Sequence, residues 1–435
     1  MERFLMDSLK EWKLRENRKP LVIMGARQVG KTWLMKEFGR LYFKRTAYIS
    51  FFNNARMKRV FDSTYDVRRI IAAINIETGI TVNPEDTLII FDEIQDAPKA
   101  FESLKYFCEN APEYYIVAAG SLLGVALHEG ISFPVGKVDL LRLYPLSFRE
   151  YLCAAGEQQL SDLLLTKDYG LIDSFRDKYI FHLKNYYFTG GMPEAVEVFI
   201  RDYAYKAARE VQKNIIFQYR GDFGKHISRQ DLPRVNMVWD SIPSQLSKEN
   251  KKFFFGKVKQ GGRSAEFERA IEWLSDAGLV NLVFRVSKPD IPLAAYKQFS
   301  MFKLFMLDIG LLGAMSDLDE KVLLEGNRLF VEFKGALAEQ YVLQQLLCET
   351  PYTPYYYGTK KSTFEQDFLL QSGMHTVPIE VKAEGNVRSQ SLRLFYEKFH
   401  PARSVRLSLL PYKDQDWLCN LPLYAVCNLR DLSVS

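Results

Sequence analysis

Gly25-Ala-Arg-Gln-Val-Gly30-Lys31-Thr32 is the stretch of sequence that decides the fold of the N-terminal part of the chain. It follows the apolar run Leu21–Gly25, which predicts a short buried strand, and it leads into Trp33–Phe38, which favours a helix. The pattern G-x-x-x-x-G-K-[ST] between a strand and a helix is typical of a loop that surrounds phosphate groups. The sequence therefore predicts a phosphate-binding loop here.

The chemistry expected of this loop follows from its residue types. Glycines let the backbone curl so that successive N–H groups and the helix N-terminus face a phosphate. Lys31 is expected to neutralise the β and γ oxygens, and the Thr32 hydroxyl to ligate Mg²⁺. The predicted nucleotide contacts are Gly25, Ala26, Arg27, Gln28, Val29, Gly30, Lys31 and Thr32.

A second apolar run, Thr87–Phe91, ends in two adjacent carboxylates, Asp92 and Glu93, 61 residues after Lys31. Carboxylates at the carboxyl end of a parallel strand point into the crevice where open α/β sheets bind ligands. We expect Asp92 to hold Mg²⁺, directly or through water. We expect Glu93 to orient or deprotonate the water that attacks the γ-phosphate, which makes it a catalytic candidate beside Lys31.

Ser121 is a third catalytic candidate. It follows the predicted strand Tyr114–Ala118 and Gly120. Its hydroxyl either contacts the γ-phosphate or the attacking water, or it only caps the helix that follows. Both interpretations stay open on the sequence.

Strands and helices alternate through the rest of this region. Thr46–Phe51 and Val138–Tyr144 are predicted strands, and Asp66–Thr78 and Lys99–Glu109 are predicted helices. Such alternation is typical of βαβ units and a parallel sheet, so the fold class is α/β. Ser147–Glu150 is a capping box that opens the next helix.

Five motifs together resemble the bacterial and archaeal AAA-type ATPases that carry a C-terminal domain of unknown function: Gly25–Thr32, Asp92–Gln95, Ala119–Leu123, Tyr144–Phe148 and Gly190–Glu194. The resemblance extends from about residue 18 to residue 382. It implies an enzyme that binds ATP and Mg²⁺ and hydrolyses ATP, with an ATPase core at residues 1–155 and a helical lid at residues 156–230.

The resemblance also implies an arginine finger that a neighbouring subunit would supply. Arg142 and Lys137 are candidates, and an exposed ion pair is the alternative role for either. A homo-oligomer or an unidentified protein partner is consistent with this. In the lid, Arg220 and Asp222 are expected to form a buried contact.

Residues 231–300 have the order helix, helix, hairpin, which is that of a winged helix. Helices are predicted at Leu232–Leu246 and Ser264–Ala277, and a hairpin at Leu279–Val286 and Leu293–Phe299. Winged helices bind DNA or pack against protein, and both uses stay open.

Between these two helices the chain is strongly basic. Ser247–Arg263 carries six basic residues and one acidic residue, whereas the whole chain has a net charge of only +5. Either this stretch contacts DNA or it is a solvated surface, and three glutamates on the second helix (Glu266, Glu268 and Glu272) oppose a phosphate-facing role. The DNA-contact candidates are Lys251, Lys252, Lys257, Lys259 and Arg263.

Residues 301–435 are predicted to form an α/β domain. A helical Glu339, then Asp367, then Glu380 and Lys382 two apart on a strand resemble the PD-(D/E)xK nuclease arrangement. By that resemblance Glu339, Asp367 and Glu380 form a possible second metal site, with Lys382 orienting water. Charges on an edge strand that only prevent aggregation are the alternative.

The composition excludes a disordered, a collagen-like and a low-complexity chain. The 435 residues are 47% hydrophobic and 26% charged, as in globular proteins. The longest uncharged apolar run, Tyr114–Leu127, is too short to span a bilayer, and the N-terminus lacks a signal-peptide pattern. We therefore expect a cytoplasmic protein without a membrane contact. Five scattered cysteines predict neither a disulfide framework nor a zinc site.

The sequence thus favours an ATPase whose hydrolysis of ATP rearranges the winged-helix and nuclease-like regions, with DNA as a candidate partner. Two alternatives stay open. One is a slow ATP-dependent switch or scaffold that needs no nucleic acid. The other is a metal-dependent nuclease that the ATPase gates.

Overall fold

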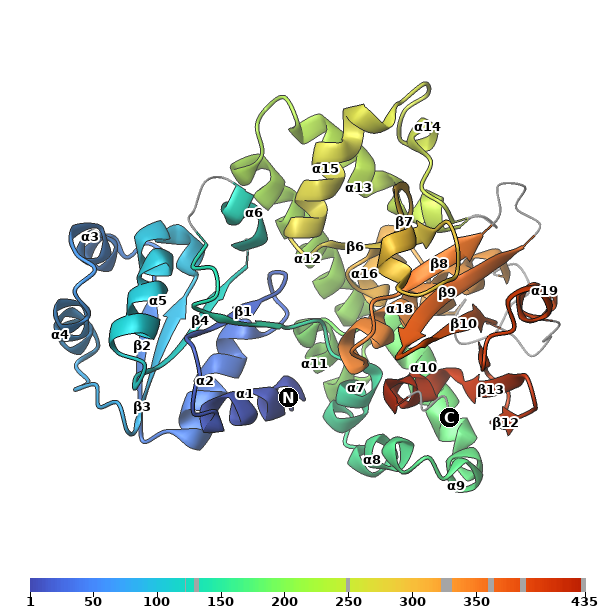
Figure 1. The fold of residues 1–435 in the computed structure, drawn as a ribbon, viewed down its shortest axis with the longest axis horizontal. Helices are drawn as coiled ribbons and strands as arrows, with labels where there is room; N and C mark the ends of the chain where they lie inside the picture. Colours follow the sequence, from blue (N-terminus) through green and yellow to red (C-terminus); the bar gives the residue numbers. More distant parts are fainter. Residues whose placement is uncertain are drawn as a thin grey trace. The chain divides into compact units, whose positions relative to one another are not determined.

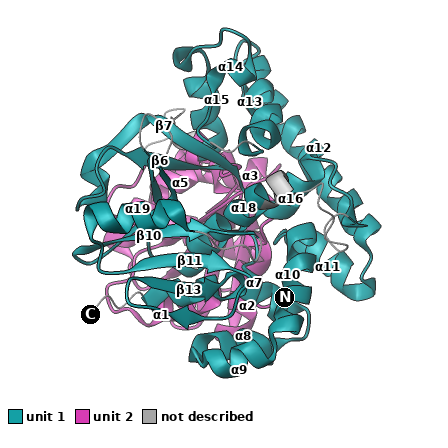
Figure 2. Cartoon of the chain, turned by 90° about the vertical axis from the view of Figure 1, so that its right-hand side faces the viewer, with its two compact units in different colours: residues 1, 145–275, 280–435 teal, residues 2–144, 276–279 magenta. Residues whose placement is uncertain are grey.

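The computed structural model describes residues 1–121, 123–128, 133–247, 251–321, 331–358, 364–383 and 389–431. The chain divides into two compact units, which Figure 2 colours separately. The N-terminal unit comprises Glu2–Tyr144 with Asp276–Leu279. The C-terminal unit comprises Met1, Pro145–Ser275 and Val280–Ser435. The predicted division into four domains, at residues 155, 230 and 300, stays a prediction.

A five-stranded parallel sheet forms the centre of the N-terminal unit (Figure 1). Its strand order is β2-β3-β4-β1-β5, so the strand before the phosphate-binding loop lies between β4 and β5. This confirms the predicted α/β class. The strands are β1 (Leu21–Met24), β2 (Arg45–Ser50), β3 (Thr87–Asp92), β4 (Tyr115–Gly120) and β5 (Asp139–Arg142).

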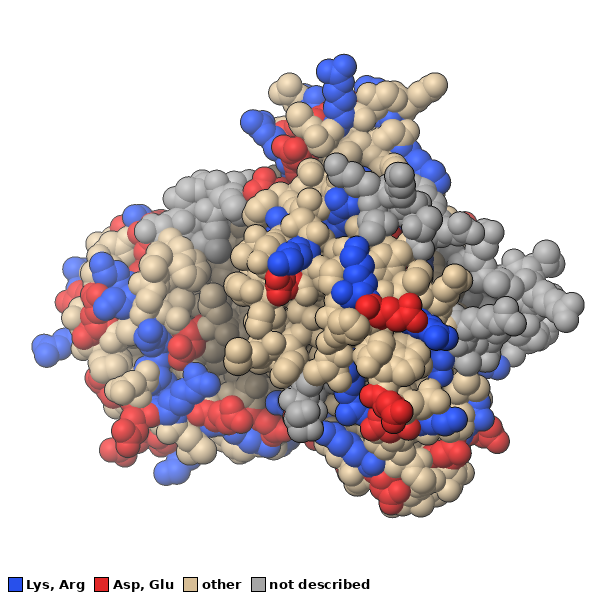
Figure 3. All heavy atoms as spheres, turned by 45° about the vertical axis from the view of Figure 1, so that its right-hand side comes forward, with Lys and Arg blue, Asp and Glu red and all other residues tan. Residues whose placement is uncertain are grey.

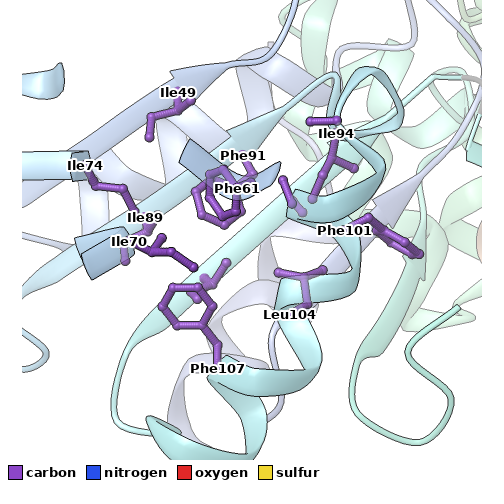
Figure 4. Packing of buried hydrophobic residues seen from close by; sticks show 14 of the residues in the cluster. Ile49, Phe61, Ile70, Ile74, Ile89, Phe91, Ile94, Phe101, Leu104 and Phe107 are labelled. Atoms are coloured by element: carbon purple, nitrogen blue, oxygen red, sulfur yellow. The ribbon is translucent and has the colours of Figure 1, made fainter. Parts of the chain in front are cut away.

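Helices cover both faces of this sheet. They are α1 (Leu5–Leu14), α2 (Lys31–Tyr42), α3 (Ala55–Ser63), α4 (Val67–Thr78), α5 (Pro98–Asn110) and α6 (Leu123–His128). Side chains of β2 and β3, including Ile49, Ile89 and Phe91, pack with α3, α4 and α5 in one buried apolar cluster (Figure 4). Because side chains alternate along a strand, Leu88 and Ile90 face the side that α2 covers.

The C-terminal unit begins with a run of helices, and those from α8 to α12 lie within the range predicted for the lid. They are α7 (Phe148–Ala154), α8 (Gln158–Thr166), α9 (Tyr169–Ser174), α10 (Arg176–Thr189), α11 (Pro193–Asp202) and α12 (Tyr205–His226). The capping box at Ser147 and Glu150 is present at the start of α7. The contact predicted between Arg220 and Asp222 is wrong as a buried pair, because Arg220 lies at the surface and pairs with Asp240 of the next helix, whereas Asp222 is buried.

The second part of this unit contains α13 (Leu232–Leu246), α14 (Phe255–Val258), α15 (Ser264–Asp276), α16 (Ile309–Met315), α18 (Val331–Glu349) and α19 (Gln390–Phe399). The apolar residues of α15 recur at helical spacing and are buried: Phe267, Ala270, Ile271 and Leu274. Short 3-10 helices occur at Ile94–Asp96 in the N-terminal unit and at Leu293–Tyr296 and Leu423–Asp431 here.

An eight-stranded mixed sheet unites the C-terminal strands in the order β12-β13-β11-β10-β9-β8-β6-β7. The strands are β6 (Val280–Val286), β7 (Lys297–Met306), β8 (Tyr355–Gly358), β9 (Glu365–Ser372), β10 (His375–Val381), β11 (Ser404–Ser408), β12 (Lys413–Asp414) and β13 (Leu418–Pro422). β9, which carries Asp367, and β10, which carries Glu380, form an antiparallel hairpin.

The predicted winged-helix hairpin lies in this same sheet. β6 pairs with β7 on one side and with β8 on the other, and β7 continues past residue 300 to Met306. The second arm starts at Lys297 rather than at Leu293. Leu293 is buried and its N–H donates to Gln371 Oε1 of β9 at 2.9 Å, whereas the Tyr296 carbonyl accepts the Ser287 N–H at 2.9 Å, directly after β6.

Two motifs that lie more than one hundred residues apart meet inside the C-terminal unit. The Asp308 side chain is fully buried at the start of α16, and its Oδ2 accepts a hydrogen bond from the Gly191 N–H at 2.7 Å. Gln344 of α18 donates to the same oxygen at 3.0 Å. The break between α10 and α11 is thereby joined to α16 and α18 through one carboxylate.

Membrane insertion by a helix has no support in the described residues. None of their helices combines the length and the apolarity needed to cross a bilayer.

Candidate functional site

The phosphate-binding loop joins β1 to α2 and has the backbone that the sequence predicts. Gly25 has φ 152° and Gly30 has φ 96°. A Cβ at Gly25 would lie 2.3 Å from the Leu143 carbonyl oxygen, so only glycine fits where the loop leaves the strand. Gly30 is the N-cap of α2 and provides no side chain to bind the first N–H groups of the helix. Those N–H groups form an anion-binding end.

Lys31 is buried in the first turn of α2, with 6% of its surface exposed. Its ammonium donates hydrogen bonds to the carbonyl oxygens of Gly25 at 2.8 Å and Ala26 at 2.6 Å, so it folds back over the loop. Burial lowers the pKa of Lys31 to about 8, although the nearby Glu93 and Asp92 carboxylates oppose this shift. An anion placed in the loop would compensate this buried positive charge.

Thr32 and Asp92 form the pair of oxygen donors that the Mg²⁺ prediction requires. Thr32 Oγ1 donates to Asp92 Oδ2 at 2.7 Å, and Asp92 is 4% exposed. The Tyr48 hydroxyl donates to the same carboxylate oxygen at 2.9 Å. Burial, followed by the charge of Asp92, raises the pKa of Tyr48 to about 12, so Tyr48 remains a hydrogen-bond donor at neutral pH.

Glu93 stands in the left-handed region, with φ 52°, directly after β3. This turn brings its carboxylate to two polar neighbours. Gln95 Nε2 donates to Glu93 Oε2 at 2.6 Å, and Ser121 Oγ donates to Glu93 Oε1 at 3.4 Å. Ser121 therefore lies beside the predicted catalytic carboxylate, whereas Leu122, which follows it, lies outside the described residues.

Sequence reasoning assigned no role to Tyr48 or Gln95. A tyrosine within the otherwise apolar centre of a predicted strand next to β3 was the available signal for Tyr48. For Gln95 the signal lies in Gly120, where a Cβ would come within 2.5 Å of Gln95 Oε1. The glycine leaves the room that this amide occupies.

The two arginine-finger candidates flank β5: Lys137 lies two residues before the strand, and Arg142 is its last residue. Lys137 pairs with Glu109 at 3.0 Å on the surface, in agreement with the ion-pair alternative. The Arg142 guanidinium lies 6.0 Å from the centre of the Tyr144 ring. Neither contact tests a role in another subunit, and that role stays a prediction.

The predicted second metal site has a different arrangement from the one expected. Among the described residues, no three His, Cys, Asp or Glu side chains gather as a group that could hold a metal ion. Glu339 pairs instead with Lys251 and, at 3.4 Å, with Lys303. Glu380 pairs with Lys382 at 2.9 Å. The ligand set resembling a nuclease is therefore divided between two lysine-paired groups.

The pKa shifts of this region follow from burial, from the same lysines and from the neighbouring acidic side chain. Burial would raise the pKa of Glu339, but the ammonium groups of Lys251 and Lys303 outweigh it and lower that pKa to about 2. Burial, together with the charge of Glu339, raises the pKa of Asp367 to about 8. These carboxyl groups thus respond to lysines and to each other within a buried cluster.

The basic stretch is split between the interior and the surface. Lys251 is buried in its ion pair, Lys252 is half-buried, and Lys248 lies outside the described residues. Lys257, Lys259 and Arg263 are exposed, and Lys259 pairs with Glu266 at 3.2 Å. Over the face drawn in Figure 3, basic and acidic side chains are interspersed.

Comparison with known proteins identifies the N-terminal region. Residues 17–152 match the family model described as an AAA domain. We call these residues the AAA region. Residues 180–322 and 334–425 match two models that are each described as a domain of unknown function. The AAA region contains every residue of the phosphate-binding loop together with Asp92, Glu93 and Ser121.

Two solved structures are similar to part of the chain. A Walker-type ATPase of Pyrococcus abyssi has 13% identity and a TM-score of 0.44, covering 72% of this chain and 94% of its own. An ORC1 protein of Aeropyrum pernix, solved in complex with DNA, has 14% identity and a TM-score of 0.27, covering 72% of this chain and 90% of its own. These scores establish no shared function. No curated protein matches the chain.

Proposed function

We propose that the AAA region binds ATP with Mg²⁺ and hydrolyses it. The observation that supports this most directly is the 2.7 Å hydrogen bond between Thr32 and Asp92 beside the buried Lys31. A hydroxyl and a carboxylate are the hard oxygen donors that Mg²⁺ prefers, so the residues fit this ion. When bound, Mg²⁺ neutralises charge on the phosphate oxygens.

Different residues bind the phosphates and assist the attacking water. The N–H groups of the loop and the N-terminus of α2 hold phosphate oxygens, and the Lys31 ammonium neutralises their charge. Glu93 orients the attacking water or accepts its proton. Ser121, 3.4 Å from Glu93, supports that carboxylate. The proposal thus assigns binding to the loop and proton transfer to the end of β3.

Glu93→Gln and Lys31→Ala separate these two roles. We expect Glu93→Gln to retain ATP binding and to lower turnover by about 100-fold or more, since the amide cannot accept a proton. We expect Lys31→Ala to lose ATP binding. Glu85→Gln, an exposed glutamate of the same unit, is the control and should change neither property. Unchanged ATP affinity in Lys31→Ala would show that the site is wrongly assigned.

A slow nucleotide switch is the alternative within the same site. It predicts tight ATP binding with wild-type turnover so low that Glu93→Gln removes almost nothing. Single-turnover and steady-state measurements on the wild type therefore decide between an ATPase with appreciable turnover and a nucleotide-dependent switch.

We further propose that ATP turnover rearranges the C-terminal unit and that DNA is its partner. Support comes from three exposed cations at α14 and α15: Lys257, Lys259 and Arg263. Three glutamates on α15 weaken this support, so the test must be direct. ATP turnover should rise when DNA is added, and neutralising the three cations should abolish that rise.

Salt dependence provides the second arm of the DNA test. Changing Lys257, Lys259 and Arg263 to glutamine should reduce the slope of log affinity against log salt by about 3, or about one unit for each lost phosphate contact. Lys225→Gln, an exposed lysine on α12, is the matched control. An unchanged slope would exclude these residues as DNA contacts.

A further inference from the structure

A buried lysine occupies the centre of the carboxylate cluster in the C-terminal unit. Lys303 of β7 is only 1% exposed. Its Nζ lies 2.8 Å from Glu365 Oε1, 3.4 Å from Glu339 Oε2 and 4.0 Å from Asp367 Oδ1. Three acidic side chains thus surround one ammonium, which occupies the space between them.

A second lysine closes the cluster from another direction. Lys251 Nζ pairs with Glu339 Oε1, so both oxygens of this carboxylate have an ammonium partner. The backbone holds Lys251 in place, because the next two residues attach to β7. Lys252 forms a bridge with Lys303, and the Phe253 N–H donates to the Phe302 carbonyl at 2.8 Å.

The remaining members of the nuclease-like pattern are also engaged. Asp367 Oδ2 accepts the Val381 N–H at 2.8 Å, and Glu380 pairs with Lys382 at 2.9 Å. A divalent ion among Glu339, Glu365 and Asp367 would have to lie beside a buried ammonium of the same sign. In an interior of low dielectric, that repulsion is strong and cannot be screened by solvent.

We propose that Lys303 takes the place of a divalent cation in this cluster, so that the native C-terminal unit binds no metal there and cleaves no phosphodiester. The ammonium neutralises the carboxylates from within the chain. The residues resembling a nuclease then stabilise the sheet instead of serving a reaction. The inference is independent of the ATPase proposal, since it concerns only residues outside the AAA region.

Removing the Lys303 ammonium leaves Glu339, Glu365 and Asp367 with Lys251 as their remaining lysine partner. The acidic side chains then outnumber the ammonium groups, so these hard oxygen donors should take a cation from solution. Tb³⁺ is a suitable probe because the centre of the Tyr356 ring lies 5.1 Å from Lys303 Nζ. Excitation of a tyrosine at this distance sensitises the luminescence of a bound Tb³⁺ ion.

The experiment uses the full chain with Asp92→Asn as the common background, so that the AAA region contributes no metal site of its own. We expect Lys303→Ala to acquire tyrosine-sensitised Tb³⁺ luminescence that the background protein lacks, and we expect Lys303→Ala/Glu339→Gln to lose it. Lys382→Ala is the matched control, because it removes a lysine that pairs with Glu380 and not with Glu339. It should acquire no such signal.

Thermal unfolding gives a readout that does not depend on luminescence. Mn²⁺ at 100 times its dissociation constant should raise the unfolding midpoint of Lys303→Ala by roughly 5 °C and leave the background protein unchanged. A folded Lys303→Ala variant that binds neither ion would overturn the proposal.

A second pair of proteins keeps the test decisive if Lys303→Ala does not fold. Mn²⁺ is titrated into the Asp92→Asn protein with Glu339 intact and with Glu339→Gln. We expect identical titrations. In a separate assay with Asp92 intact, we expect no cleavage of single- or double-stranded DNA in Mn²⁺ with or without ATP. Metal binding that disappears with Glu339→Gln, or cleavage that does, would show that the cluster is a working metal site.

Discussion

The Thr32 hydroxyl donates a hydrogen bond to Asp92 across 2.7 Å and thereby links the start of α2 to the end of β3. The two side chains come from segments sixty residues apart, and the order of the parallel sheet brings them to one edge. Tyr48 donates to the same Asp92 oxygen from β2. Three elements therefore orient one carboxylate toward the phosphate-binding loop.

Asp92→Asn should weaken the binding of ATP with Mg²⁺ and leave the binding of ATP without Mg²⁺ unchanged. The amide retains the shape of the side chain but loses the charge that favours Mg²⁺. We expect the Mg²⁺ stimulation of ATP affinity to disappear and turnover to fall by about 100-fold or more, whereas ATP without Mg²⁺ binds as in the wild type. Calorimetric titration with and without Mg²⁺ measures both. Asp86→Asn, on the loop before β3, is the control, and Mg²⁺ stimulation that survives in Asp92→Asn would contradict the assignment.

The pKa of Lys31 predicts how ATP affinity depends on pH. Burial lowers this pKa to about 8 in the free protein, and the ammonium form is the one that holds phosphate. Affinity should therefore be complete below pH 8 and decline as pH rises through it. At pH 9, about one tenth of the lysine is protonated, so affinity should be about tenfold weaker than at pH 7.

Fluorescence titration with a labelled ATP analogue from pH 7 to pH 10 measures this profile. Binding should also take up protons above pH 8, which calorimetry in two buffers detects. Lys44→Gln, which removes an exposed lysine after α2, should leave the profile unchanged. A flat affinity between pH 7 and pH 9 would mean that Lys31 does not contact the phosphates.

Gly120→Ala should disturb Glu93 without touching it. The new Cβ would lie 2.5 Å from Gln95 Oε1, and the flexible amide must move away from it. Gln95 then no longer holds Glu93 Oε2 at 2.6 Å. We expect turnover to fall by about tenfold while ATP affinity and fold are retained, since positioning errors act on the reaction more than on binding.

Gln95→Ala should reproduce the effect of Gly120→Ala, and combining the two should add little, because both remove the same contact. Steady-state kinetics of the two single variants and the double variant measure this. If the two losses multiply, Gly120 acts through something other than Gln95.

The strand, loop and helix around Gly25–Thr32 were predictable because their signal is local. Two glycines and a lysine at fixed spacing after a strand specify a backbone path by themselves, and a strand ending in Asp92 and Glu93 predicts where carboxylates lie. The alternation of strands and helices also predicted the parallel sheet. In each case the signal lies within one contiguous stretch of chain.

Partners that come from distant segments were not predictable in this way. The period of a strand indicates which face a residue occupies but not which residue lies opposite. The sequence placed Lys251 in a basic stretch and Glu339 in a metal site, yet the two pair with each other. The sequence assigned no role to Lys303, because a single lysine in an apolar stretch does not indicate which side chains it will meet.

Asp308 provides the last prediction, which concerns stability. Gly191 and Asp308 lie 117 residues apart in the sequence, and the structure joins them through one buried carboxylate. This carboxylate also accepts the Leu311 N–H at 3.1 Å. Asp308→Ala would leave these buried donors without a partner, which costs about 3 kcal/mol in the free energy of unfolding.

Hydrogen exchange locates the effect. The amides of Gly191 and Leu311 should exchange about 100-fold faster in Asp308→Ala, because 1.4 kcal/mol corresponds to a factor of ten.

Burial raises the pKa of Asp308, so the folded chain keeps this proton to a higher pH than the unfolded chain. The stability that this group contributes is therefore present at low pH and is lost as pH rises through its folded pKa. Asp308→Asn should remove that pH dependence, whereas Asp202→Ala, at an exposed helix end, should alter neither exchange nor pH dependence.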